Sequence, residues 1–278
     1  MNTLEVTLLV WVGSLLAGFL GALTGLGGGI VITPLLTLGF GIDIRYAVGA
    51  TLVSVIATSS GAAAAYVKEG FTNIRIGMFL EIATTVGAVV GASLAARLPT
   101  STLAVIFGIV LLYSAYASSR PASARVATDQ PDRLATTLRM DSTYPSAQGL
   151  KKYHVHGVPG GFSLMFVAGV LSGLLGIGSG AVKVIAMDQA MRIPFKVSTT
   201  TSNFMIGVTA AASAGVYLQR GYIDPGLAMP VMLGVLLGSL LGARVLSRAK
   251  TPVLRLIFGG VVAVLAFEMI YHGLTGRL

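Results

Sequence analysis

The chain alternates apolar runs with short polar, glycine-containing or proline-containing breaks. In chain order the runs are Val6–Leu23, Ile30–Phe40, Ala47–Tyr66, Ile74–Ala96, Leu103–Ala117, Phe162–Leu175, Ala181–Met191, Ser198–Leu218, Pro225–Leu246 and Val253–Tyr271. A transmembrane helix needs about 20 mostly apolar residues, and three runs on each side of the polar segment 118–160 approach that length. The pattern predicts an all-α polytopic membrane protein.

Two runs, 30–40 and 181–191, are too short to cross a bilayer as straight helices. Each directly follows a cluster of glycines, the first in TGLGGGIVITP (24–34) and the second in LGIGSGAVKVI (175–185). A backbone without hydrogen-bond partners is costly in hydrocarbon, so such a break must pack against protein or line a wet cavity.

The two halves align without a gap at an offset of 151 residues. The offset pairs Gly25, Gly27 and Gly29 with Gly176, Gly178 and Gly180. We therefore divide the chain into a first membrane repeat (1–117), a polar linker (118–160) and a second membrane repeat (161–278). Each repeat is predicted to be a glycine-broken hairpin plus three transmembrane helices. An odd number of crossings makes the repeat inverted, which is a common plan among transporters.

Composition and charge support this topology. The chain is 54% hydrophobic and 10% charged, with a net charge of +9, whereas soluble domains carry about 25% charged residues. The linker has an excess of basic over acidic residues, and cytoplasmic loops of membrane proteins are enriched in Lys and Arg. We expect a cytoplasmic linker; a regulatory or partner-binding loop is the alternative. The positive net charge therefore does not indicate a nucleic-acid partner. The first run has no Lys or Arg before it and is interpreted as a retained transmembrane segment.

Metal and cofactor chemistry is not expected. There is no cysteine, and the three histidines, His154, His156 and His272, do not form a helical metal-binding pair. With no paired acid and histidine inside the apolar runs, the sequence does not predict an enzyme.

The glycine breaks predict an anion site. Each short helix after a break begins with unpaired N–H groups at the positive end of its dipole, and glycine lets the backbone approach a ligand closely. Tight helix packing is the alternative, and it accounts better for the pairs Gly87/Gly91 and Gly238/Gly242. The predicted substrate-binding residues at the breaks are Thr24, Gly25, Gly27, Gly28, Gly29, Gly176, Gly178, Ser179 and Gly180.

Polar residues within the apolar runs extend this site. Lys183 lies three residues after the second break and is expected to contact the anion; a structural ion pair with Asp188, Glu81 or Glu268 is the alternative. Glu81 either carries a coupling proton or pairs with a lysine. Thr51, Ser54, Ser202 and Asn203 are candidates to bind the anion, although hydroxyls in membrane helices often bond to their own backbone.

The motif GFLGALTGLGGGIVITPLL and its copy GVLSGLLGIGSGAVKVIAM resemble the TauE/SafE family of bacterial membrane transporters, sulfite or organosulfonate exporters. The resemblance covers nearly the whole chain except the linker. Ser179 replaces a glycine of the motif, and Ile185 stands where the family often has proline. The resemblance implies transport of a sulfur oxyanion or sulfonate across the bacterial inner membrane.

We therefore expect a secondary transporter that exports a small sulfur-containing anion, a sulfonate such as sulfoacetate or sulfite, by alternating access. The membrane potential or a proton gradient would drive it, without a cofactor. The expected partners are the anionic substrate and the lipid bilayer, with homodimer formation left open. An anion channel and a membrane scaffold without transport activity are the alternatives.

Overall fold

The computed structural model describes residues 3–24, 29–68, 70–119, 132–146, 149–246 and 251–276. Its helices are α1 (Thr3–Thr24), α2 (Gly29–Pro34), α3 (Ile44–Lys68), α4 (Ile74–Ala95), α5 (Thr100–Ser119), α6 (Arg133–Thr137), α7 (Val158–Leu175), α8 (Gly180–Ile185), α9 (Phe195–Gln219), α10 (Pro225–Leu246) and α11 (Thr251–Thr275). Two π-helical segments, η1 (Leu35–Gly39) and η2 (Ala186–Ala190), follow α2 and α8 directly, and the strands are β1 (Ser142–Ser146) and β2 (Gly149–Tyr153). The apolar runs therefore form helices, as predicted.

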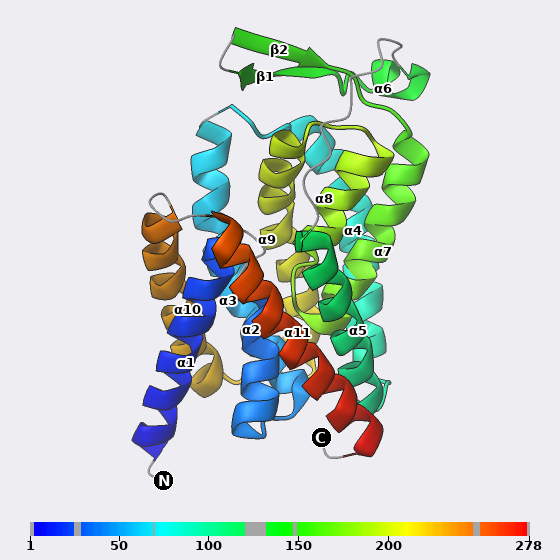
Figure 1. Ribbon diagram of the computed structural model, residues 1–278. Helices are drawn as coiled ribbons and strands as arrows, with labels where there is room; N and C mark the ends of the chain where they lie inside the picture. Colours follow the sequence, from blue (N-terminus) through cyan, green and yellow to red (C-terminus); the bar gives the residue numbers. More distant parts are fainter. Residues whose placement is uncertain are drawn as a thin grey trace.

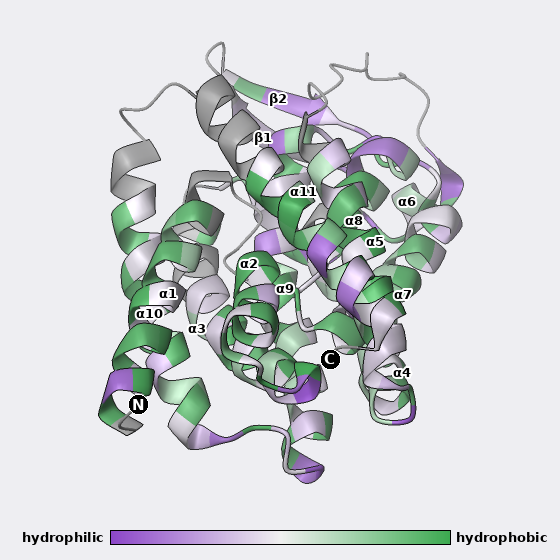
Figure 2. Cartoon of the chain, turned by 60° about the horizontal axis from the view of Figure 1, so that its bottom comes forward, coloured by the Kyte–Doolittle hydropathy of each residue, from purple (hydrophilic) through white to green (hydrophobic). Residues whose placement is uncertain are grey.

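Within the described residues, three helices have the length and the apolar composition to cross a membrane. They are Ile74–Ala95, Val158–Leu175 and Pro225–Gly242. Shorter apolar helical segments are Leu4–Leu20, Gly29–Gly39, Ile44–Ser60, Thr100–Tyr116 and Gly259–Thr275. Figure 2 shows apolar residues along the helices, whereas hydrophilic residues gather at the strands and at connecting loops. The chain is a helical membrane protein.

Equivalent elements of the two halves begin 151 residues apart. Helices α2, α3, α4 and α5 begin at positions 29, 44, 74 and 100, and α8, α9, α10 and α11 begin at 180, 195, 225 and 251. The packing follows the same correspondence, because α1 packs on α10 as its counterpart α7 packs on α4, while α3 pairs with α9 and α5 with α11. In Figure 1, α1 begins at the bottom beside the N-terminus, whereas α7 begins at the top beneath the strands.

The second glycine break lies at the tip of a helical hairpin. In the second half, the N–H of His156, just before α7, donates to the carbonyl of Met191, just after η2, at 3.0 Å. The hairpin that contains the second break therefore begins and ends on the same side of the helical bundle. In the first half, Gly13 of α1 lies against the side chain of Leu35 of η1, so this pair of segments also runs side by side.

The linker contains structure that the sequence did not predict. Its strands β1 and β2 pair antiparallel, from Ser142 with Tyr153 to Ser146 with Gly149. They lie at the top of Figure 1, above the helices. Tyr153 and Met140 are buried in one cluster with Ile76 of α4. The linker is thus anchored to the helical bundle by an apolar contact.

The glycine pairs assigned to packing do lie at helix contacts. A Cβ on Gly87 or Gly91 of α4 would collide with backbone carbonyl oxygens of α7, and a Cβ on Gly91 would meet that of Val170. At the equivalent α1–α10 contact, a Cβ on Gly238 would collide with the carbonyl oxygen of Leu15. Small residues let the two backbones approach, which is how membrane helices pack closely.

We expect Gly91→Ala to destabilise the protein by about 1–3 kcal/mol, the usual cost of overpacking, because the α4 and α7 backbones must separate. Gly215→Ala on α9 is the matched control, since nothing lies within 4 Å of a Cβ there. Denaturant unfolding of both variants in detergent provides the measurement. Equal stability of the two variants would contradict the packing role of Gly91.

Candidate functional site

Gly29, the described glycine of the first break, meets the second break between α3 and α9. A Cβ on Gly29, the first residue of α2, would lie 3.7 Å from the carbonyl oxygen of Gly176 and 3.0 Å from Cγ2 of Thr51. Gly25, Gly27 and Gly28 lie outside the described residues. Thr24 ends α1, and its side chain is likewise not described. Gly29 is therefore the predicted residue of the first break that the structure places against the second break.

The second break has a backbone shape that requires small residues. Gly176, Gly178 and Ser179 adopt φ of 69°, 68° and 42°, in the left-handed region where residues other than glycine are uncommon. The Oγ of Ser179 does not cap α8; it donates to the carbonyl of Ala168 at 2.6 Å. A Cβ on Gly180 would lie 2.8 Å from Cδ1 of Ile206. The break is therefore covered by protein and held by α7 and α9.

Lys183 is fully buried in α8, directly beyond this break. Its Nζ donates to Oγ1 of Thr209 on α9 at 2.5 Å, and the same hydroxyl lies 2.7 Å from Oε1 of Glu81 on α4. Thr209 thus bridges the ammonium and the carboxylate. Because a lone charge is very costly in a membrane interior, the pair Lys183–Glu81 explains how both charges are tolerated.

Glu81 has spare hydrogen-bonding capacity within this network. Thr85 donates to Oε1 at 3.2 Å, while Oε2 is buried with no hydrogen-bond partner among the described residues. The hydroxyl of Ser172 on α7 is another buried oxygen without a partner in the described part of the chain. Buried polar groups are normally paired, so such oxygens mark a place where a proton or a polar ligand can bind.

The other candidate hydroxyls mostly bond to backbone. Thr51 donates to the carbonyl of Ala47 at 2.8 Å and lies 2.9 Å from Oγ1 of Thr33, and Ser54 donates to the carbonyl of Ala50 at 3.0 Å. Ser202 donates to the carbonyl of Gly180 at 3.2 Å, at the second break itself. Asn203 follows Ser202 on α9 and is half-buried. Of this group, Thr51 and Ser202 lie against the breaks.

Sequence reasoning missed Thr209, the residue that joins the two charges. It lies seven residues after Ser202, and therefore two turns further along the same face of α9. The equivalent residues in the first half, Thr51 and Thr58, have the same spacing. This repeated pair of hydroxyl residues is the signal that would have identified it.

The charged network has no counterpart in the other half. Positions equivalent to Lys183 and Glu81 by the offset of 151 are Ile32 and Met232, and only Thr209 has a polar equivalent, Thr58. Thr58 donates to the carbonyl of Ser54 in its own helix. The two halves share a backbone plan, but the charges occur at only one of the two equivalent positions.

Comparison with known proteins identifies relatives along nearly the whole chain. The family model described as sulfite exporter TauE/SafE matches residues 10–269. The probable membrane transporter protein YunE of Bacillus subtilis (strain 168) is 27% identical over 267 residues, covering 94% of this chain and 96% of the relative. A probable membrane transporter protein of Xylella fastidiosa (strain 9a5c) is 26% identical over 270 residues, covering 96% of each chain. No solved structure gives a significant match.

The bridge predicts strong coupling between Lys183 and Glu81. We expect Lys183→Met and Glu81→Gln each to destabilise the protein by about 3–5 kcal/mol, because each leaves a buried charge unpaired. The double variant should lose much less than the sum of the two single losses. Denaturant unfolding in detergent gives the four stabilities of this double-mutant cycle.

Thr209→Val tests the bridging hydroxyl, and Thr58→Val at the equivalent position is its matched control. The first should destabilise the protein more than the second, since only Thr209 contacts both charged groups. Additive losses in the cycle, together with equal effects of the two valine variants, would show that the network does not couple the charges.

Proposed function

Because the chain belongs to the sulfite exporter TauE/SafE family, we propose that it is a secondary transporter which exports a small sulfur-containing anion by alternating access. The family and the relatives named as probable membrane transporters support a membrane transporter. The substrate class that we propose is a sulfonate such as sulfoacetate, or sulfite. The bacterial inner membrane is the proposed location, with the linker in the cytoplasm and with homodimer formation left open.

We propose that the two halves form an inverted repeat, each with a broken hairpin and three transmembrane helices. The common offset of element starts, the exchanged pairing of α1–α10 and α7–α4, and the opposite directions of α1 and α7 in Figure 1 support it. Inverted halves that meet around a central site can expose that site to one side and then to the other.

The observation that carries the proposal is the approach of Gly29, from the first glycine break, to the second break beside a fully buried lysine. α8 continues into η2, so its N-terminal N–H groups and Lys183 offer positive charge at the second break. The hydroxyls of Thr51 and Ser202 lie at the same place. In the site that we propose, Ser54, Asn203 and the glycines complete the surroundings of the anion.

Lys183 is engaged with Thr209 in the structure, so the anion must compete with Glu81 for the positive charge. We propose that the anion replaces the carboxylate as partner of Lys183 and that Glu81 then takes up a proton. Oε2 of Glu81 supports this assignment, since it has no hydrogen-bond partner among the described residues and can accept a proton. Anion and proton would therefore bind and leave together, so a proton gradient would be coupled to the movement of the anion.

Flux through proteoliposomes loaded with labelled sulfoacetate, sulfite, thiosulfate or sulfate tests the transport proposal. We expect saturable flux of a sulfonate or of sulfite, and at least a tenfold reduction in Lys183→Ala, because the site loses its charge. Lys152→Ala on the exposed face of β2 is the control variant.

Each alternative gives a different flux result. Flux that does not saturate would favour an anion channel. Normal flux in folded Lys183→Ala would overturn the assignment of Lys183. No flux of any of these anions from folded protein would favour a membrane scaffold.

Glu81→Gln tests the coupling proposal separately. In the unsubstituted protein, an interior more acidic than the exterior should accelerate efflux, because the proton leaves with the anion. Glu81→Gln should retain anion exchange and lose this acceleration, since glutamine does not titrate. Efflux that responds equally to the pH gradient in both proteins would refute the coupling role of Glu81.

A further inference from the structure

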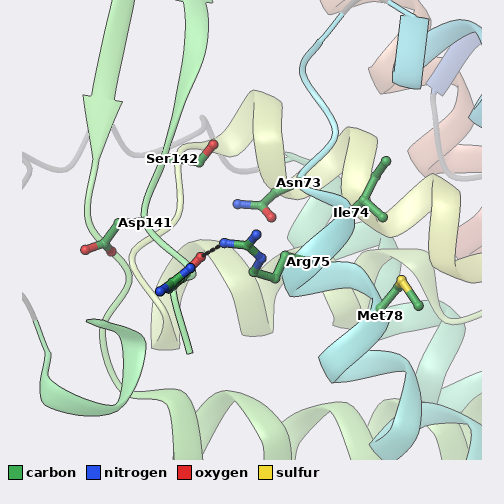
Figure 3. A pocket seen from close by; sticks show the side chains of 7 residues that line it. Asn73, Ile74, Arg75, Met78, Asp141 and Ser142 are labelled. Carbon is green, nitrogen blue, oxygen red and sulfur yellow. Dashed lines mark hydrogen bonds between the residues drawn. The ribbon is translucent and has the colours of Figure 1, made fainter. Parts of the chain in front are cut away.

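A cavity of about 500 Å³ lies where the linker meets the start of α4. It is lined by Asn73, Ile74, Arg75 and Met78 on one side and by Arg139, Asp141 and Ser142 of the linker on the other (Figure 3). None of these lining residues belongs to a glycine break. Glu81, the network residue on α4, lies further along the helix and inside the bundle. The transport proposal does not use this cavity.

The cavity carries positive charge that its one carboxylate does not neutralise. Nη1 of Arg75 donates to the backbone carbonyl of Arg139 at 2.7 Å, which leaves most of its guanidinium donors unused. Asp141 is directed toward the strands, where it accepts from the N–H of Val155 at 2.9 Å and lies 3.1 Å from Nδ1 of His154. Figure 3 shows its carboxylate on the side away from Arg75. Among the described residues, neither arginine forms an ion pair.

Arg139 occupies a backbone position that normally favours glycine. It follows α6 with φ of 49°, and the N–H of Met140 donates to the carbonyl of Ala135 at 2.9 Å, which closes the helix end. Glycine is the usual residue at this left-handed position after a helix. An arginine here costs backbone energy, and it places a charged residue in the lining of the cavity.

An apolar stripe continues from the cavity along α4. Ile74, Met78, Ile82 and Val86 follow at intervals of four residues, and their side chains are 43%, 64%, 60% and 53% exposed. In a membrane-spanning helix such an exposed stripe faces lipid chains. The cavity therefore combines arginines at the level of the loops with an apolar path along the helix.

Asn73 and Tyr153, two further polar residues at this junction, are uncharged and hydrogen-bonded to each other. The Asn73 side chain accepts from the N–H of Ile76 at 3.1 Å, which caps α4, and donates to the Tyr153 hydroxyl at 2.7 Å. Burial raises the pKa of the Tyr153 phenol, so it stays neutral. The arginines thus set the charge of the site.

We propose that this cavity binds the headgroup of an anionic phospholipid, with the phosphate on Arg75 and Arg139 and an acyl chain along Met78 and Ile82. Guanidinium groups bind phosphate through paired, charge-assisted hydrogen bonds. Basic pockets beside membrane helices on the cytoplasmic side are typical sites for anionic headgroups. The lipid would join the linker to α4 at the membrane surface.

The test measures thermal unfolding and native mass spectra of the purified full chain in detergent. Added phosphatidylglycerol should raise the melting temperature and remain bound, whereas phosphatidylcholine should have little effect. Arg75→Gln should weaken the apparent affinity for phosphatidylglycerol roughly tenfold, as expected for losing a hydrogen bond to a charged group. Arg220→Gln, an exposed arginine at the end of α9, should leave the affinity unchanged.

Arg139→Gly separates lipid binding from folding. Glycine suits the left-handed backbone, so the variant should match or exceed the unsubstituted protein in stability without lipid, and still lose the response to phosphatidylglycerol.

Sodium phosphate and glycerol phosphate form the second arm of the test. A full shift with these soluble anions would indicate a free-phosphate site and overturn the lipid proposal, as would unchanged lipid binding in both arginine variants. None of these measurements depends on transport.

Discussion

The rest of the site depends on how the positive charge of Lys183 is held inside the helical bundle. A fully buried ammonium requires a partner of opposite charge and hydrogen bonds to polar groups. The structure supplies both across the two halves, because Lys183 of α8 bonds to Thr209 of α9, which bonds to Glu81 of α4. The charge therefore connects the second glycine break to a helix of the first repeat. Movement of one half against the other would change this contact, and so would the anion in the function that we propose.

The helices around the site approach one another closely because glycines lie at their contacts. Glycines let α4 approach α7 and let α10 approach α1, so that carbonyl oxygens lie where a Cβ would otherwise stand. These contacts hold equivalent helices in both halves, whereas Glu81, Thr209 and Lys183 occur at only one of two equivalent positions. Shared packing with unequal polar residues is what duplication followed by specialisation produces. The chain therefore has one such charge network and not two.

Much of the architecture could be predicted from the sequence, because apolar runs and their offset of 151 residues reflect requirements of the bilayer and of the repeat. The short runs after the glycines correspond to α2–η1 and α8–η2, and the longer runs correspond to helices. Side-chain partners were harder to predict. Ser54 proved to bond to its own helix, and Thr209 was not singled out, since a threonine inside an apolar run gives no local sign of what it faces. The strands β1 and β2 were missed because their sequence is polar and the apolar anchors, Met140 and Tyr153, are isolated.

The linker has a physical connection to the helices that carry the charge network. Asn73 caps α4, its side chain bonds to Tyr153 and to the carbonyl of Met140, and its N–H donates to Oγ1 of Thr201 on α9. One residue therefore joins the linker to the beginning of α4 and to the neighbouring turn of α9. Glu81 lies about two turns further along α4 and Thr209 about two turns further along α9. A clamp at these ends restrains the separation of the two helices on which the Lys183–Glu81 bridge depends, so the linker belongs to the machinery that sets the geometry of the site.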